Sequence, residues 1–355
     1  MFLNRSGKLT DRCAEVEAAV RGHDSARMTE AVPRLWEAAQ QAPPAELDEA
    51  LSRCVALLPE LGISAGGQFA VLCGALVELG AGPDPLVPAV AEGLLDALTE
   101  AERFRAAWER VHPDEELPEP GDPTALEPAT AAMTAAGGDE DGALRAALGW
   151  LSAGNWAMPA TTLLQHSTAL RETFPHRARL RELGSGLADV RGDLDCMLGL
   201  LRLLDAERLL VLHRETRRGW WVTVDGVGDN FQLHTLLAGA LAQPGRIAGL
   251  TVDPAWVAVA TDAPPERFGG MVTGSFNLVD GHGGWIWNEG LPADIPLLDG
   301  VRVVVLDPPS YTRSWENVRR YPTVPGSLTV DGELGPADAA AWLARVAPAG
   351  NPVDD

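Results

Sequence analysis

Apolar residues in the first third of the chain recur at helical spacing. One series consists of Leu47, Ala50, Leu51, Cys54, Val55 and Leu58, and a second runs from Val87 to Leu98. Steps of three and four residues are typical of an amphipathic helix with one buried face. Capping residues, prolines and glycines divide the region into helices of roughly 12–16 residues, with a new helix expected to begin at Thr99. We predict an all-helical domain over residues 1–112, built from helical hairpins, with a solenoid-like stack as an alternative.

The next stretch, residues 113–141, has a different composition. It reads PDEELPEPGDPTALEPATAAMTAAGGDED and contains few large apolar residues. Proline, glycine and acidic residues in this proportion are typical of a linker or a loosely packed excursion. Helical spacing then returns over residues 142–205, where Pro159 and Pro175 are expected to separate helices. We predict that this helical segment packs between the two main parts of the protein.

From residue 206 onward the pattern changes to short strands and tight turns. Asp299-Gly300 is a strong hairpin signal, and the apolar run Val301–Leu306 is typical of a central strand buried on both faces. Hairpins dominate and long helical crossovers are rare, so we predict an α+β domain over 206–355 with a mainly antiparallel sheet. The other strands are expected at 209–213, 220–224, 256–260, 271–280 and 285–289, and a final helix from Pro336.

One stretch, residues 219–242 (GWWVTVDGVGDNFQLHTLLAGALA), joins a strand to a helix. Trp220, Val222 and Val224 alternate with the residues between them, as in a pleated strand with a buried face. Gly226 and Gly228 then interrupt the strand. Asp229 stands three residues before Gln232 and opens an apolar helical series, which predicts a capped helix start.

This strand, turn and helix have the outline of a phosphate-binding corner, but two features contradict that function. The dinucleotide-binding fingerprint requires a third glycine where Phe231 stands, and Asp225 and Asp229 place two carboxylates where a phosphate would lie. Their charge favours a cation, an amine or a guanidinium group. Asn230 and His234 are expected to share a helical face near this corner. The alternative is a capped helix whose histidine only packs.

A second group of polar residues occupies the loop 280–289, DGHGGWIWNE. His282 lies between glycines, and Asp280, Asn288 and Glu289 flank two tryptophans. A polar loop over aromatic residues is a reasonable shape for a small-molecule site. The alternative is that the glycines serve the turn, the tryptophans fill the core and the histidine faces water. The ligand-binding candidates are thus Asp225, Asp229, Asn230, His234, Asp280, His282, Asn288 and Glu289.

Charge limits the classes of partner. The formal net charge is −22, and it is uneven: −15 over residues 1–150, +1 over 151–250 and −8 over 251–355. A phosphate-rich partner would be repelled, so nucleic acid and anionic membrane surfaces are not expected as partners. A basic protein partner is favoured by the same argument.

The four cysteines, Cys13, Cys54, Cys73 and Cys196, form no closely spaced pair, and three fall on apolar helical faces. We therefore expect reduced thiols and a cytoplasmic protein. No stretch has the length and apolarity of a signal peptide or membrane span. Arginine greatly outnumbers lysine, which indicates a GC-rich coding sequence and a bacterial source.

Motifs for catalysis, metal binding or cofactor binding are not found, and no resemblance to a family is evident. Catalytic residues, metals and cofactors are therefore not predicted. The first hypothesis is a non-catalytic interaction or regulatory protein with a protein partner, because helical surfaces and strong acidity suit a basic partner. The alternative is a hydrolase-like enzyme or a binding protein for a small polar or cationic ligand. Its site would combine the corner at residues 225–234 with the loop at 280–289.

Overall fold

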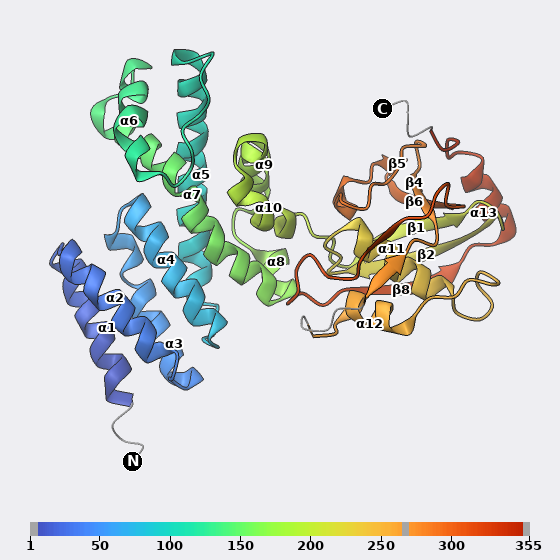
Figure 1. Ribbon diagram of the computed structural model, residues 1–355, viewed down its shortest axis with the longest axis horizontal. Helices are drawn as coiled ribbons and strands as arrows, with labels where there is room; N and C mark the ends of the chain where they lie inside the picture. The colour runs from blue at the N-terminus through green and yellow to red at the C-terminus, as the bar shows by residue number, and fades with distance from the viewer. Residues whose placement is uncertain (1–5, 265–269, 351–355) are drawn as a thin grey trace. The chain divides into compact units, whose positions relative to one another are not determined.

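The computed structural model describes residues 6–264 and 270–350 (Figure 1). Contacts within the chain divide it into two compact units, residues 1–201 (unit 1) and residues 202–355 (unit 2). Unit 1 is helical, and unit 2 contains a six-stranded mixed sheet with helices on its faces. The predicted α+β class with a helical N-terminal region is confirmed.

Unit 1 is built around two long helices, α5 and α7. Helix α7 packs against α4, α5 and α6, while α1 packs on α2 and α3. The α-helices are α1 (Ser6–Arg21), α2 (Ser25–Ala39), α3 (Pro44–Val55), α4 (Ile63–Glu78), α5 (Leu86–Val111), α6 (Leu126–Ala135), α7 (Glu140–His166), α8 (Thr168–Thr173), α9 (Arg177–Leu187) and α10 (Asp195–Leu201). The apolar series that predicted helices provide the buried faces of α3 and α5.

Trp156 anchors α7 in this core. Its indole Nε1 donates a hydrogen bond of 2.8 Å to the Ile63 carbonyl, and the ring lies directly over Gly93 of α5. A Cβ atom at Gly93 would stand only 2.3 Å from the ring, so the close approach of α5 and α7 requires glycine there. The tryptophan and the glycine together fix the separation of the two helices.

Helices α5 and α7 are longer than the sequence pattern indicated. The helix start predicted at Thr99 is wrong, because α5 continues through it and the Thr99 hydroxyl bonds to the Leu95 carbonyl of the preceding turn. The break predicted at Pro159 is also wrong. Pro159 lies inside α7 and packs on Gly74 of α4, where the missing side chain leaves room for the ring. Packing against a neighbouring helix thus outweighs the local cost of proline.

The acidic stretch 113–141 lies inside unit 1. It contains α6, whose Ala129, Ala132 and Met133 are buried, and α6 packs against α5 and α7. The Trp150 indole donates a hydrogen bond of 2.8 Å to the Pro118 carbonyl and ties the preceding segment to α7. Small alanine side chains supply the buried face of α6, so a count of large apolar residues underestimates its packing.

The main sheet of unit 2 has the strand order β4-β6-β1-β2-β8, with the short β5 paired to β6. Strands β1 and β6 are parallel and the other pairs are antiparallel, and β6 lies inside the sheet as predicted. The bounds are β1 (Glu207–His213), β2 (Arg218–Asp225), β4 (Asn277–Asp280), β5 (Leu297–Leu298), β6 (Val301–Asp307) and β8 (Ser327–Glu333). A separate pair consists of β3 (Met271–Thr273) and β7 (Ser314–Glu316).

Helices cover both faces of this sheet. On one face, α11 (Asn230–Leu241) packs its leucines against Trp220, Val222 and Val224 of β2. On the other face, α13 (Pro336–Leu343) adds Trp342 and Leu343 to a second cluster. The strand predicted over residues 256–260 is wrong, because this stretch belongs to helix α12 (Pro254–Thr261). Asp253 caps that helix and Pro254 occupies its first turn, two start signals that outweigh the β-branched residues.

Candidate functional site

The corner between β2 and α11 has the predicted strand, turn and helix. Gly226 has a positive φ of 63°, and the Asp229 carboxylate accepts a hydrogen bond of 2.8 Å from the Gln232 amide. The Gln232 side chain in turn accepts one of 2.8 Å from the Gly228 amide. These two bonds satisfy backbone donors at the start of α11, as in a capping box.

The other amides of the first helical turn are used by the 287–290 segment. The Asn230 amide donates to the Gly290 carbonyl and the Phe231 amide to the Asn288 carbonyl, both at 3.0 Å. The Asn230 side chain also donates to the Trp287 carbonyl at 2.8 Å. Since carbonyls and a carboxylate already accept from these donors, the helix start is not free to bind a phosphate.

His234 connects α11 to the start of β4. Its Nε2 atom accepts hydrogen bonds from the Ser275 and Phe276 amides at 3.0 and 3.2 Å, so the neutral ring carries its proton on Nδ1. Burial, together with the positive charge of Arg313, lowers the pKa of His234 to about 3. The imidazole is therefore neutral at physiological pH and has a fixed tautomer, which fits a positioning role better than acid–base chemistry.

Three buried polar atoms at this corner make no hydrogen bond of good geometry. They are Asn230 Oδ1, His234 Nδ1 and Asn288 Oδ1, on side chains between 1% and 3% exposed. A loose side-chain hydrogen bond nevertheless joins Asn288 to His234 and favours the charged form of the imidazole. Asn230 Oδ1 has no such contact, and a buried polar group without a partner costs free energy.

Asp229 is the titratable carboxylate of the corner. Burial raises its pKa to about 6, although the Gln232 amide and the nearby Arg320 favour the charged form. Like-charge repulsion from the exposed Glu289 contributes to this rise. Asp229 thus changes charge just below neutral pH, and the corner brings together Asp229, Asn230, His234, Asn288 and Glu289.

The other three predicted residues lie elsewhere. Asp225 alternates with Val224 on β2, so its side chain leaves the opposite face of the sheet, where it accepts a hydrogen bond from the Ala206 amide. Asp280 closes its own turn by accepting from the His282 and Gly284 amides. Asp280 stands four residues after Phe276, whose amide bonds to His234. At the rise of an extended strand, four residues separate the Asp280 turn from that contact by about 13 Å. His282 is exposed and its Nε2 contacts the Leu297 carbonyl.

Several residues around the corner were not anticipated from the sequence. Trp315 of β7 packs its ring 5.0 Å from that of His234, and Arg313 and Arg320 act on the charges of His234 and Asp229. All three lie in the segment after β6, and no motif marks them. Their position after β6 could have indicated them, because ligand-binding residues often follow the carboxyl end of a strand that lies in a parallel pair.

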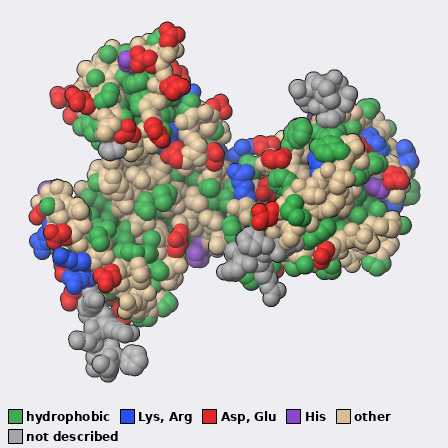
Figure 2. Space-filling model, viewed as in Figure 1, with side chains coloured by type: hydrophobic (Ala, Val, Ile, Leu, Met, Phe, Trp, Pro, Cys, Tyr) green, Lys and Arg blue, Asp and Glu red, His purple; other side chains and the backbone are tan. Residues whose placement is uncertain are grey.

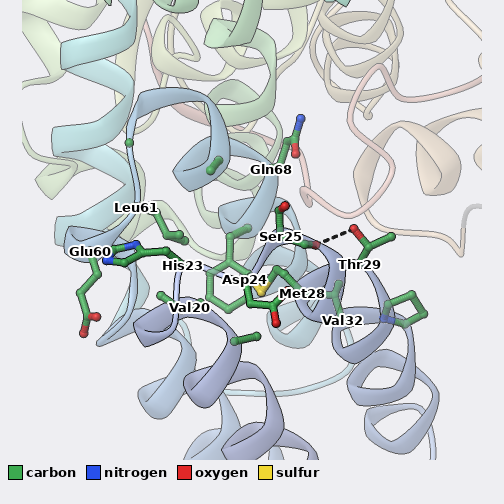
Figure 3. A pocket seen from close by; sticks show the side chains of 15 residues that line it. Val20, His23, Asp24, Ser25, Met28, Thr29, Val32, Glu60, Leu61 and Gln68 are labelled. Carbon is green, nitrogen blue, oxygen red and sulfur yellow. Dashed lines mark hydrogen bonds between the residues drawn. The ribbon is translucent and has the colours of Figure 1, made fainter.

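Unit 1 contributes two hollows. The first, of about 550 Å³, lies between the α1–α2 turn and the start of α4, with Val20 and Phe69 among its apolar lining and His23, Asp24 and Glu60 among its polar lining (Figure 3). The second, of about 790 Å³, is lined by residues of α6 and its flanks: Thr124, Leu126, Glu127, Thr130, Ala131, Thr134 and Glu140. Neither hollow includes a residue of the unit 2 corner.

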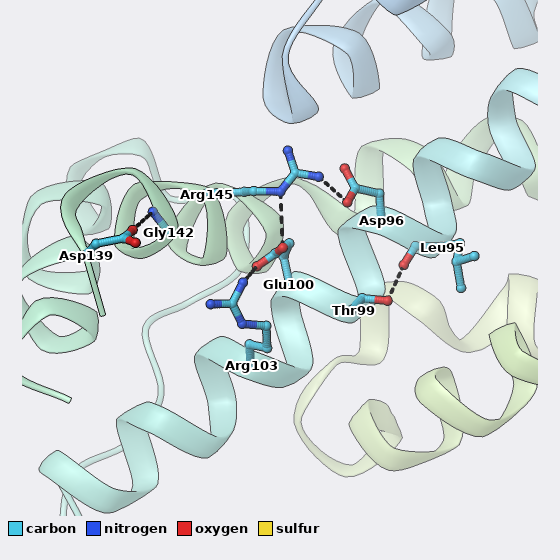
Figure 4. Close-up of polar contacts among 8 residues, drawn as sticks. All are labelled: Leu95, Asp96, Thr99, Glu100, Arg103, Asp139, Gly142 and Arg145. Atoms are coloured by element: carbon cyan, nitrogen blue, oxygen red, sulfur yellow. Dashed lines mark hydrogen bonds and ion pairs between the residues drawn. The ribbon is translucent and has the colours of Figure 1, made fainter. Parts of the chain in front are cut away.

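The second hollow belongs to an acidic face. Residues 113–141 contain nine Asp and Glu and no Lys or Arg, and Figure 2 shows acidic side chains gathered over the part of unit 1 that holds α6. In the helices against which α6 packs, Arg145 of α7 bonds to Asp96 and Glu100 of α5, and Glu100 also accepts from Arg103 (Figure 4). These ion pairs join α5 and α7. Among the residues that the structure describes, no arginine forms an ion pair with a carboxylate of residues 113–141, and Glu115 contacts His112 at 3.2 Å.

Three of the cysteines meet in the core of unit 1. Cys13, Cys54 and Cys73 come from α1, α3 and α4, and all are buried, whereas Cys196 is exposed. Contact with Cys54, together with burial, raises the pKa of the Cys13 thiol far above its usual range. The three thiols therefore behave as small apolar side chains rather than nucleophiles.

Over residues 6–264 and 270–350, no group of three or more His, Cys, Asp or Glu side chains could hold a metal ion. Within the same residues, no helix has the length and apolarity needed to cross a membrane. Comparison of the chain with protein-family models, with curated proteins and with solved structures found no match.

Proposed function

We propose that this protein is a non-catalytic interaction protein whose unit 1 binds a basic segment of a partner protein. The acidic face formed by residues 113–141 carries the proposal. Nine carboxylates without a single basic residue, three of them in α6 and α7 and the others in the segments that flank these helices, repel one another, and binding of a cation relieves this repulsion.

The shape of this face supports the same function. Helix α6 buries Ala129, Ala132 and Met133 and turns Glu127 and Thr130 toward the hollow. The Thr130 hydroxyl already donates to the Leu126 carbonyl, so this small side chain does not need a hydrogen-bond acceptor from a partner. Small side chains allow close approach of a second helix, and carboxylates at the rim suit lysine or arginine. An amphipathic basic helix docked in a groove has this chemistry.

Charge of this kind acts mainly on recognition and association rate. Opposite charges steer the encounter over about 8 Å at physiological ionic strength, and added salt screens them. Binding through the acidic face is therefore expected to weaken steeply as salt rises. An interaction carried by buried apolar surface alone would respond far less.

The test uses two full-length variants with the same change in net charge. In the first, Glu116, Glu119 and Glu127 of the acidic face become Gln. In the control, Glu37, Glu49 and Glu172, exposed residues of unit 1 outside that face, become Gln. Each protein is immobilised and exposed to an extract of its own cells at low and high ionic strength, and retained proteins are identified by mass spectrometry.

We expect a basic protein to be retained by the wild type and by the control. The acidic-face variant should retain about tenfold less, since three exposed ion pairs together contribute on the order of 1.5 kcal/mol. Retention should fall at high ionic strength. Equal retention by both variants, or no reproducible basic partner of the wild type, would contradict the proposal.

A second candidate function is the binding of a small polar or cationic ligand at the unit 2 corner. The buried Asn230 Oδ1, which has no partner, and the loosely paired His234 Nδ1 and Asn288 Oδ1 favour it, because a small polar molecule could satisfy Asn230 Oδ1 and improve the other two contacts. Asp229 and Glu289 would favour a positive charge on that molecule. Native mass spectrometry of the full-length protein from its own cells should then show an added mass that Asn288→Leu removes. Wild-type protein of unmodified mass would count against this candidate.

A further inference from the structure

Four side chains of unit 2 form a partly exposed aromatic–arginine patch: Trp285, Trp287, Tyr311 and Arg313. The Trp285 ring lies 6.1 Å from Trp287 and 6.4 Å from Tyr311, and its plane is within 18° of the tyrosine's. The Arg313 guanidinium lies 5.8 Å from the Trp285 ring and 5.4 Å from the Tyr311 ring. Trp287 is 49% exposed and Tyr311 is 52% exposed.

Hydrogen bonds to neighbouring residues fix the positions of Trp285 and Arg313 in the patch. Trp285 pairs with Val279 of β4, and its indole Nε1 donates to the Gly350 carbonyl at 2.9 Å. Arg313 donates through Nη2 to the Asn277 side chain at 3.0 Å and to the Phe276 carbonyl at 3.3 Å. Rigid aromatic side chains lose little conformational freedom on binding, so a prearranged patch is favourable for recognition.

Arg313 differs from most arginines of unit 2. Six others form ion pairs with carboxylates: Arg202, Arg208, Arg214, Arg218, Arg302 and Arg345. Among the residues that the structure describes, no carboxylate pairs with Arg313, although the chain contains 50 acidic residues. A half-buried guanidinium beside exposed tryptophan and tyrosine is the composition of an interface hot spot.

We propose that this patch binds an extended, proline-containing segment of a separate partner protein, and that the segment carries a carboxylate to Arg313. Proline-rich segments dock on rows of aromatic rings because their extended helix is preformed. The planar guanidinium matches a carboxylate with two parallel hydrogen bonds.

The net negative charge of the protein does not prevent this contact. Charges beyond about 8 Å are screened at physiological ionic strength, so the positive charge of Arg313 governs the contact with a carboxylate at the patch. The neighbouring Arg214 and Asp307 already neutralise each other at 2.7 Å. This patch and the acidic face of unit 1 thus select partners of opposite charge.

A peptide of the required chemistry occurs in the chain itself and provides a defined probe. Residues 113–120, PDEELPEP, combine three prolines with four carboxylates. The experiment measures binding of this peptide, labelled and blocked at both ends, to the full-length protein by fluorescence anisotropy. Comparison peptides are PNQQLPQP, without charge, and ADEELAEA, without proline.

Three protein variants complete the design. Trp287→Ala and Tyr311→Ala truncate exposed rings of the patch, and Met158→Ala truncates a residue of unit 1 that is 57% exposed. Unchanged circular dichroism and melting temperature establish that each variant is folded. We expect saturable binding of the acidic peptide, about tenfold weaker for Trp287→Ala and Tyr311→Ala and unchanged for Met158→Ala. Both comparison peptides should bind at least about fivefold more weakly.

Absence of saturable binding would overturn the proposal. So would equal binding by the patch variants, or equal binding of the uncharged or proline-free peptide. Sedimentation velocity over a range of protein concentrations tests the identity of the partner. Self-association that Tyr311→Ala abolishes would identify a second copy as the occupant and overturn the assignment to a separate protein.

Discussion

The turn that holds Asp229 and the turn that holds Asp280 begin from the same local chemistry. Each follows a strand, each includes glycines, and in each the aspartate accepts hydrogen bonds from backbone amides two to four residues later. The surroundings differ. Asp229 lies against α11, Arg320 and the 287–290 segment, whereas the Asp280 turn packs on residues 347–350 at the far end of β4. The same signature therefore produces a corner with a buried histidine and poorly paired polar atoms in one place and an ordinary turn in the other.

The largest effect is expected at the glycine of the first turn. Gly226 has φ of 63°, and a Cβ atom there would lie 2.0 Å from the Pro325 carbonyl oxygen. Gly226→Ala should lower the free energy of unfolding by at least about 4 kcal/mol, because strain and a backbone clash add. Gly300→Ala is the control, since Gly300 has φ of 78° with open space around it, and should cost only about 1 kcal/mol. Urea denaturation measures both, and equal losses would contradict the role of the clash.

The histidine that follows each of the two aspartates, His234 in α11 and His282 in the second turn, provides the next test. His234→Ala removes the acceptor for two buried amides and leaves a cavity, so the free energy of unfolding should fall by about 3 kcal/mol. His282→Ala changes an exposed side chain and should stay within about 0.5 kcal/mol of wild type. Thermal and urea unfolding of both variants check this. Similar losses would mean that the second turn depends on its histidine as much as the first.

A smaller effect concerns pH. The pKa of Asp229 is raised to about 6 from 3.8, so the folded state binds the proton more tightly than the unfolded state between those values. The stabilisation from this proton is present at low pH and is lost as pH rises through 6. Asp229→Asn keeps a capping side chain without the charge.

The stability of Asp229→Asn relative to wild type should therefore rise by about 2 kcal/mol between pH 4 and pH 7, allowing for partial solvent exposure. Urea denaturation at a series of pH values measures the difference. Parallel pH profiles for the two proteins would show that burial does not perturb this carboxyl.

The reactivity of the cysteines compares buried and exposed residues of the same type, and it requires no change to the sequence or to the stability. In native protein, a thiol reagent should modify Cys196 rapidly, because it is exposed. Cys13, Cys54 and Cys73 should react only after denaturation. Spectrophotometric counting with and without denaturant distinguishes the two classes, and rapid reaction of more than one native thiol would contradict their packing.

Local signals predicted much of the fold. Periods of two and three to four placed the hairpin of β1 and β2, the central β6 and the helical character of unit 1. The Asp229 cap followed from its distance to Gln232. The wrong predictions arose where neighbouring elements outweighed local preference, as at Pro159, which Gly74 accommodates, or where helix-start signals outweighed β-branched residues, as at Pro254.

The sequence by itself determined where this chain makes strands, turns and caps, because those depend on residues a few positions apart. Only the tertiary structure decided which polar groups meet. It separated Asp225 from Asp229 by directing one to the opposite face of the sheet, joined Asn288 to His234, and set Arg313 among exposed rings. Burial, hydrogen-bond pairing and pKa depend on contacts between residues that are tens of positions apart in the sequence. The spacing of such residues along the chain does not show how close they lie in the folded protein.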